Sequence, residues 1–128
     1  MGIVGAIAAG GAAGSVIRYY LGRWNGPMEV GTLPWGTLTA NVVGCLLIGL
    51  LGTLFATSWT EARPEIRMGL LVGVLGGFTT FSSFGLESLQ LMQAGHADRA
   101  LLYIGLSNVL GLAAAWTGYR FATLLVTP

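Results

Sequence analysis

The sequence predicts an all-α integral membrane protein with four transmembrane helices, a break in the third helix, and an antiparallel (dual-topology) homodimer. Of its 128 residues, 54% are hydrophobic and only 9% are charged, whereas soluble domains carry roughly 25% charged residues. Four segments also contain the run of about 20 predominantly apolar residues that a transmembrane helix needs. The formal net charge of +1 argues against a nucleic-acid-binding protein, and the lipid bilayer is the expected partner.

The expected helices form one transmembrane domain and span residues 2–21, 35–56, 67–93 and 100–125. Small residues recur at every fourth position in the first helix, at Gly10 and Gly14, and in the third, at Gly69, Gly73 and Gly77. This spacing lets two helix backbones approach closely. Each of these two faces is therefore expected to pack against a neighbouring helix.

The third segment contains a stretch, residues 76–84, that is unsuited to a continuous helix. Its sequence, GGFTTFSSF, combines two glycines, four hydroxyl side chains and three phenylalanines without a charge. Glycine costs backbone entropy and threonine is restricted against the preceding turn, so the helix is expected to break here. Irregular backbone at membrane depth persists only where protein or a water-filled cavity satisfies its polar groups. The break therefore indicates an ion or substrate site.

The arginines do not choose an orientation in the membrane. Four spans would place three arginines on each side, Arg63, Arg67 and Arg120 against Arg18, Arg23 and Arg99. Because arginine bias in short loops sets topology, a chain without bias can insert both ways. Two antiparallel copies would then act as the inverted repeats that many transporters carry within one chain. Four helices are also too few to line and wall an aqueous path alone, which again indicates an oligomer.

Aromatic rings and hydroxyls near the break are candidate contacts for an anion. Phe81 and Phe84 are spaced i, i+3 and project from one helix face, and the positive edges of their rings can solvate an anion without a formal cation. The alternative for these rings is a packed aromatic pair. The surrounding hydroxyls supply donors that core packing does not require: Thr79, Thr80, Ser82 and Ser83.

Asn41 is the polar side chain of the second segment that needs a partner. Its amide can donate to an anion, in which case Asn41→Asp would repel the ion, or it can form a hydrogen bond between two helices. Thr39 could supply a second contact to the ion, although threonine hydroxyls also bond back to their own helix.

Three further features have two interpretations each. Glu87 is either a helix-end carboxylate in the headgroup region or a carboxylate at the mouth of the path. Arg18 either snorkels to the interface or attracts anions to a vestibule. Tyr103, Ser107 and Gly111 are spaced i, i+4, i+8, which indicates either a hydroxyl track or a helix interface tolerant of small residues.

Three motifs together resemble those of the Fluc (CrcB-like) fluoride channels. They are GGAAGSVIRY at residues 10–19, GTLTANVVG at 36–44 and GGFTTFSSF at 76–84. They fall on three of the four segments, and length and hydropathy match over the whole chain. The resemblance implies a dual-topology homodimer with two antiparallel pores that export fluoride passively from the cytoplasm across the cell (inner) membrane.

The resemblance also implies roles for individual residues. In the family, the phenylalanines corresponding to Phe81 and Phe84 line the pores, and the asparagine corresponding to Asn41 contributes a polar group. A structural sodium ion on the dimer axis is held there by main-chain carbonyls at the break, which correspond to those of Gly76 and Thr79 from both subunits. An unwound segment frees carbonyls that can coordinate a hard cation.

Other classes of function fit the sequence less well. A small proton-coupled multidrug exporter of dual topology would need a membrane-embedded carboxylate, and only Glu87 could serve. A non-transporting membrane assembly subunit, built on the glycine faces, would leave the hydroxyl-rich break unexplained. An enzyme is not expected, because no pair of nucleophile and base is apparent. The single histidine and single cysteine exclude a metal cluster of these two residue types.

Overall fold

The computed structural model describes residues 2–24, 29 and 31–126, which contain helices and connecting segments but no strand. The elements in chain order are α1 (Ile3–Trp24), α2 (Trp35–Thr57), α3 (Pro64–Met68), the π-helical turn η1 (Gly69–Val74), α4 (Leu75–Phe78), α5 (Phe81–Gln93) and α6 (Ala97–Val126). Helices α1, α3 and α6 each extend by a turn or less beyond the expected bounds. Pro64 suits the first turn of α3, where its missing N–H costs no hydrogen bond.

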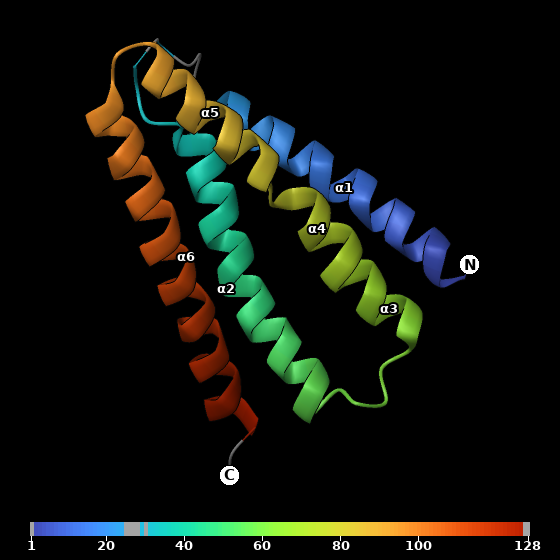
Figure 1. The fold of residues 1–128 in the computed structure, drawn as a ribbon. Helices are drawn as coiled ribbons and strands as arrows, with labels where there is room; N and C mark the ends of the chain where they lie inside the picture. The colour runs from blue at the N-terminus through green and yellow to red at the C-terminus, as the bar shows by residue number, and fades with distance from the viewer. Residues whose placement is uncertain (1, 25–28, 30, 127–128) are drawn as a thin grey trace.

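The helices pack as two pairs, which contact each other through α2 and are also linked by α5 (Figure 1). Helix α1 runs alongside α3, η1 and α4, and α2 runs alongside α6. Helix α5 continues beyond the break and contacts both α2 and α6. Between these three helices the buried side chains Leu38, Leu91, Ala100 and Tyr103 form a core, and Phe84 packs against it. Helix α5 therefore ties the broken helix to the second pair.

Close backbone contact holds the first pair together. A side chain at Gly14 would clash with the carbonyl oxygen of Val74 and lie 2.8 Å from the backbone nitrogen of Phe78. A side chain at Gly73 would lie 2.8 Å from the carbonyl oxygen of Ile7. The expectation that both glycine faces pack against a neighbouring helix is confirmed, and the neighbours are each other.

The third helix breaks at Thr79 and Thr80, within the expected stretch. Both residues have extended backbone, with φ −84° and ψ 157° at Thr79 and φ −154° and ψ 119° at Thr80. The helix restarts at Phe81 because the Thr80 hydroxyl accepts a hydrogen bond from the Ser83 N–H, which caps the new helix end. Nothing in the sequence indicates the π-helical turn η1, which lies against α1 earlier in the same helix.

Among the described residues, three helical segments are long and apolar enough to cross a membrane. They are 35–57, 64–93 and 97–126, with mean hydropathy of 2.0, 1.5 and 1.5, and the broken helix is one of them. Helix α1 is not among the three, because alanine and glycine replace larger aliphatic side chains over much of its length. An all-helical membrane fold is thus confirmed, while four spans and an antiparallel dimer stay predictions.

Candidate functional site

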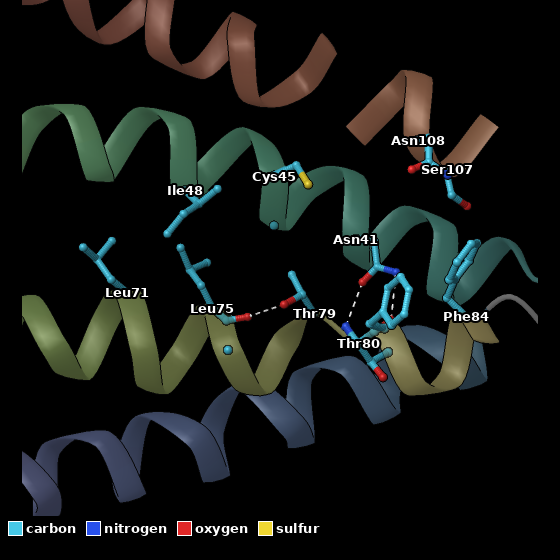
Figure 2. A pocket seen from close by; sticks show the side chains of 13 residues that line it. Asn41, Cys45, Ile48, Leu71, Leu75, Thr79, Thr80, Phe84, Ser107 and Asn108 are labelled. Atoms are coloured by element: carbon cyan, nitrogen blue, oxygen red, sulfur yellow. Dashed lines mark hydrogen bonds between the residues drawn. The ribbon is translucent and has the colours of Figure 1, made fainter. Parts of the chain in front are cut away.

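A cavity of about 370 Å³ lies beside the break. Its walls come from α2, η1, α4, α5 and α6 and from the break itself (Figure 2). None of the lining residues carries a formal charge: Asn41, Gly44, Cys45, Ile48, Leu71, Leu75, Gly76, Thr79, Thr80, Phe81, Phe84, Ser107 and Asn108. The cavity therefore brings candidate residues from the second, third and fourth apolar segments to one uncharged space.

Asn41 braces the break. Its Oδ1 accepts a hydrogen bond of 2.8 Å from the Thr80 N–H, and its Nδ2 donates one of 3.0 Å to the Thr80 carbonyl oxygen (Figure 2). Asn41 thus supplies the Thr80 N–H with the acceptor that a continuous helix would otherwise supply, and it adds a donor to the Thr80 carbonyl oxygen. These two hydrogen bonds join α2 to the break between α4 and α5, and one Nδ2 hydrogen remains for a further acceptor.

The hydroxyls of the break bond mainly to the chain itself. Thr79 Oγ1 donates to the Leu75 carbonyl oxygen at 2.9 Å. Thr80 Oγ1 lies 3.2 Å from Ser82 Oγ and 3.1 Å from Ser83 Oγ, and it also accepts from the Ser83 N–H. These hydroxyls therefore hold the ends of the two half-helices. Of the four candidates, Thr79 and Thr80 line the cavity.

A row of aromatic rings leads from the cavity into the core. The ring centroids of Phe81 and Phe84 are 5.4 Å apart, and those of Phe84 and Tyr103 are 5.3 Å apart. Phe81 is 83% exposed, whereas Tyr103 is fully buried. Phe84 is thus part of a packed aromatic cluster, while the described chain leaves most of the Phe81 ring uncovered.

Glu87 lies where α2, α5 and α6 meet. Its Oε1 accepts a hydrogen bond of 2.7 Å from Thr37 Oγ1, and its Oε2 accepts one of 2.7 Å from the Tyr103 hydroxyl. It also lines a second cavity, of about 330 Å³, together with Glu29 and Gln90. Glu87 is therefore a hydrogen-bonded carboxylate between the aromatic row and a second cavity.

Helix α6 brings two adjacent polar side chains to the first cavity. Ser107 Oγ is buried and has no hydrogen-bond partner among the described residues. Asn108 is exposed, and its Nδ2 donates at 2.7 Å to the Ile104 carbonyl oxygen of its own helix. Gly111 lies against α2, because a side chain there would come within 3.5 Å of Cys45 Sγ. The polar series on α6 thus ends in a close contact between helices.

Arg18 and Thr39 are two further candidate residues that lie outside the cavity. Arg18 reaches from α1 to the break, where its Nε donates to the Gly77 carbonyl oxygen at 3.1 Å. Neither snorkelling nor attraction of anions accounts for this contact. Thr39 is exposed on α2 and does not line the cavity. The structure therefore brings neither side chain to the cavity wall.

Several residues at or near the cavities were not predicted from the sequence as candidates, and Thr37, Gly44 and Asn108 are three of them. Thr37 could have been found from the sequence, since it lies four residues before Asn41 and therefore on the same helix face. Gly44 leaves room for the methyl group of Thr79, but its sequence context does not distinguish it from other glycines. Asn108 is recognisable only once the rotation of α6 about its axis is known.

The carbonyls of Gly76 and Thr79 are among those at the break that lack the N–H a continuous helix would provide. The Thr80 N–H, which would bond the Gly76 carbonyl oxygen, is donated to Asn41. The Ser83 N–H would bond the Thr79 carbonyl oxygen in a continuous helix, but here it donates to the Thr80 hydroxyl. Gly76 is exposed, with nothing within 4 Å of where a side chain would stand. Such oxygens suit a hard cation, although two from one chain are too few to surround it.

Comparisons with known proteins identify the family. Residues 5–119 match the family described as CrcB-like protein, Camphor Resistance (CrcB). Proteins named fluoride-specific ion channel FluC are similar: that of Thermus thermophilus is 49% identical over 121 residues, covering 94% of this chain and 93% of the relative. That of Rhizobium johnstonii is 46% identical over 112 residues (88% and 89%), and that of Pseudomonas fluorescens is 45% identical over 122 residues (93% and 95%).

These matches confirm the resemblance of the three motifs. They cover the break, the first cavity and the aromatic row. Together with the three apolar helical segments among the described residues, they make the protein a multi-pass membrane protein. The chain belongs to the CrcB-like protein family.

Proposed function

We propose that the protein is a fluoride-specific ion channel that lets fluoride leave the cytoplasm passively. The observation that carries the proposal is the match, over nearly the whole chain, to relatives named fluoride-specific ion channel FluC. The uncharged cavity beside a break in a membrane helix supports it. A channel performs no covalent chemistry, so the proposed function is not enzymatic.

The cavity offers a small anion several donors without a fixed cation. The Ser107 hydroxyl is buried and unpaired among the described residues, and one Nδ2 hydrogen of Asn41 remains. The edges of the Phe81 and Phe84 rings add partial positive charge. Fluoride would exchange water for these groups, and the lack of a charged lining residue would keep binding weak enough for the ion to leave.

The path would continue along the aromatic row toward the second cavity. Tyr103, at the end of the row, donates to Glu87, and Thr37 donates to the other oxygen of the same carboxylate. Each oxygen of Glu87 accepts a charge-assisted hydrogen bond. An anion passing nearby would therefore meet a carboxylate whose oxygens already have donors. The second cavity would then give the ion access to water.

A second, antiparallel copy would complete the channel. Phe81 is 83% exposed, and the Gly76 side of α4 is uncovered, so one chain leaves the break side of the cavity open. Asn108 is exposed on an apolar helix, although polar side chains in membranes face protein or water rather than lipid. The balanced arginines support copies inserted in opposite directions, each with α1 as a fourth span. Two such copies would form two antiparallel pores.

A structural sodium ion on the dimer axis is part of the proposal. The carbonyl oxygens of Gly76 and Thr79 would hold it, two from each copy, because their helical donors are diverted to other acceptors. When bound, the ion would supply positive charge to the carbonyl ends of two half-helices. The proposed location of the assembly is the cell (inner) membrane.

The proton-coupled multidrug exporter is not favoured. Glu87, its one candidate for an embedded carboxylate, already accepts hydrogen bonds at both oxygens, and the similar proteins carry the name of a channel. A non-transporting subunit would leave the cavity without a role. Uptake of cationic dyes driven by a pH gradient separates the exporter from the channel.

Efflux from liposomes tests the proposed channel. Purified protein reconstituted into liposomes is expected to release fluoride, followed with a fluoride-selective electrode, while chloride loaded in parallel vesicles stays inside. Gly22→Ala, which adds a methyl group in open space, serves as a variant expected to behave like the wild type. Folded protein that releases no fluoride, or that releases chloride equally fast, would contradict the proposal.

A further inference from the structure

The carbonyl end of α4, the half-helix before the break, is in contact with the guanidinium of Arg18. The last carbonyls of a helix lack intrahelical donors and carry partial negative charge. In a continuous helix the Gly77 carbonyl oxygen would accept from the N–H of Phe81, but the break separates these two residues. The Gly77 oxygen instead accepts from Arg18 Nε at 3.1 Å, and Ser15 Oγ lies 3.5 Å from it.

Helix α1 delivers Arg18 to this carbonyl through close packing. Gly11, Gly14 and Arg18 lie on one helix face at the spacing i, i+3, i+7. A side chain at Gly77 would clash with the Gly11 carbonyl oxygen, and one at Gly14 would lie 2.8 Å from the backbone nitrogen of Phe78. The two backbones are therefore in contact one turn before Arg18, which sets the position of its side chain beside Gly77.

The charge of Arg18 is not neutralised by an acid. Within the part of the chain that the structure describes, the one ion pair joins Arg63 to Glu65. Arg18 is only partly exposed, so its interaction with the helix end is screened less than that of a surface charge. A guanidinium also stays protonated at every physiological pH. The carbonyl end of α4 is thus its main electrostatic partner.

We propose that Arg18 is a positioning residue, a tethered cation that caps the carbonyl end of α4 and so holds Thr79 and Thr80 in their extended conformation. Arg18 thereby supplies the Gly77 oxygen with a donor in place of the N–H that the break removes. This role goes beyond the proposed channel function, because it concerns the conformation of the break whether or not an ion passes.

Amide hydrogen exchange of the purified protein tests this role. The N–H groups of Thr80 and Ser83 report on the break, since they bond to Asn41 and to the Thr80 hydroxyl. Arg18→Met keeps the length of the side chain but removes the donor and the charge, and it is expected to speed exchange at these amides about tenfold. Arg18→Lys keeps the charge and is expected to restore most of the protection. Arg18→Gln, a neutral donor, is expected to resemble Arg18→Met.

Arg23→Met is the matched control. Arg23 lies in the same helix but bonds the Tyr19 hydroxyl and stacks over that ring, so exchange at the break is expected to stay unchanged. Wild-type exchange in Arg18→Met, or equally fast exchange in Arg18→Lys and Arg18→Met, would overturn the proposal. Equal protection in Arg18→Gln and Arg18→Lys would overturn its electrostatic basis. Fluoride efflux, measured separately, tests the channel, and its failure would leave the exchange result standing.

Discussion

Replacing Asn41 with leucine tests whether one amide holds the break. The substitution keeps a side chain of similar size but removes both Oδ1 and Nδ2. The N–H and carbonyl groups of Thr80 then lose the partners that lie 2.8 and 3.0 Å away. Because Thr80 is the N-cap residue of α5 and has extended backbone, its N–H has no helical acceptor that could replace Asn41, whereas its carbonyl oxygen keeps the first N–H donor of α5.

The magnitude follows from two hydrogen bonds that are partly buried. Each contributes about 1 kcal/mol net, and a backbone group left unpaired costs about 1–3 kcal/mol. Asn41→Leu is therefore expected to destabilise the break by about 2–4 kcal/mol. Expressed as amide exchange at Thr80, this is an acceleration of roughly 30- to 1,000-fold. Fluoride efflux is expected to fall with it, because Thr80 lines the cavity.

Hydrogen exchange read by mass spectrometry, together with thermal unfolding in detergent, measures the effect. Asn108→Leu is the control, since Asn108 lines the same cavity but bonds only to its own helix. It is expected to leave exchange at Thr80 unchanged. Asn41→Asp keeps the acceptor for the Thr80 N–H but loses the donor, so an intermediate exchange rate is expected. Wild-type protection of Thr80 in Asn41→Leu would refute the assignment of Asn41 as the brace.

Three further substitutions test other contacts. Phe81→Ile is expected to cut fluoride efflux while the unfolding temperature stays near wild type, because the ring is 83% exposed in one chain. The dimer is expected to form as well, because isoleucine keeps an apolar side chain on the face proposed to meet the second copy. Full efflux would refute the place of Phe81 on the path. Tyr103→Phe removes a donor to the carboxylate of Glu87 and is expected to cost about 1.5–3 kcal/mol in denaturant unfolding; no measurable change would contradict that bond. Gly14→Ala forces two backbones apart and is expected to lower the free energy of unfolding by about 1–3 kcal/mol. Gly22→Ala, in open space, is expected to be neutral or to raise it by up to about 1 kcal/mol. Equal effects of the two substitutions would contradict the packing of α1 on the broken helix.

The break and the glycine faces were predictable because they depend on local properties. Paired glycines and threonines weaken a helix wherever they occur, and the extended residues Thr79 and Thr80 lie in that stretch. Glycines at every fourth position permit close helix contact, which Gly14 and Gly73 make. In both cases the property belongs to one segment and does not require knowledge of where the others lie.

The pairing of polar groups across helices was not predictable. Asn41 and Thr80 are 39 residues apart, and Thr37 and Glu87 are 50 apart. Such pairs depend on how each helix is rotated about its axis. A soluble helix would reveal that rotation through its apolar face, but α2 is apolar all round. The sequence therefore identified Asn41 as a residue in need of a partner but could not identify the partner.

The hydrogen bonds at the break bear on how an anion would be held. The side chains of Thr79, Thr80 and Ser83 already bond within the chain, and Asn41 uses both of its polar atoms on Thr80. The hydroxyls that the sequence offered as candidate anion contacts are therefore mainly structural. They shape the cavity, but few of them remain free to donate a hydrogen bond to an anion. An anion in that cavity would meet Ser107, one amide hydrogen and the edges of aromatic rings. Few and uncharged contacts favour passage over tight binding, which is what a channel requires.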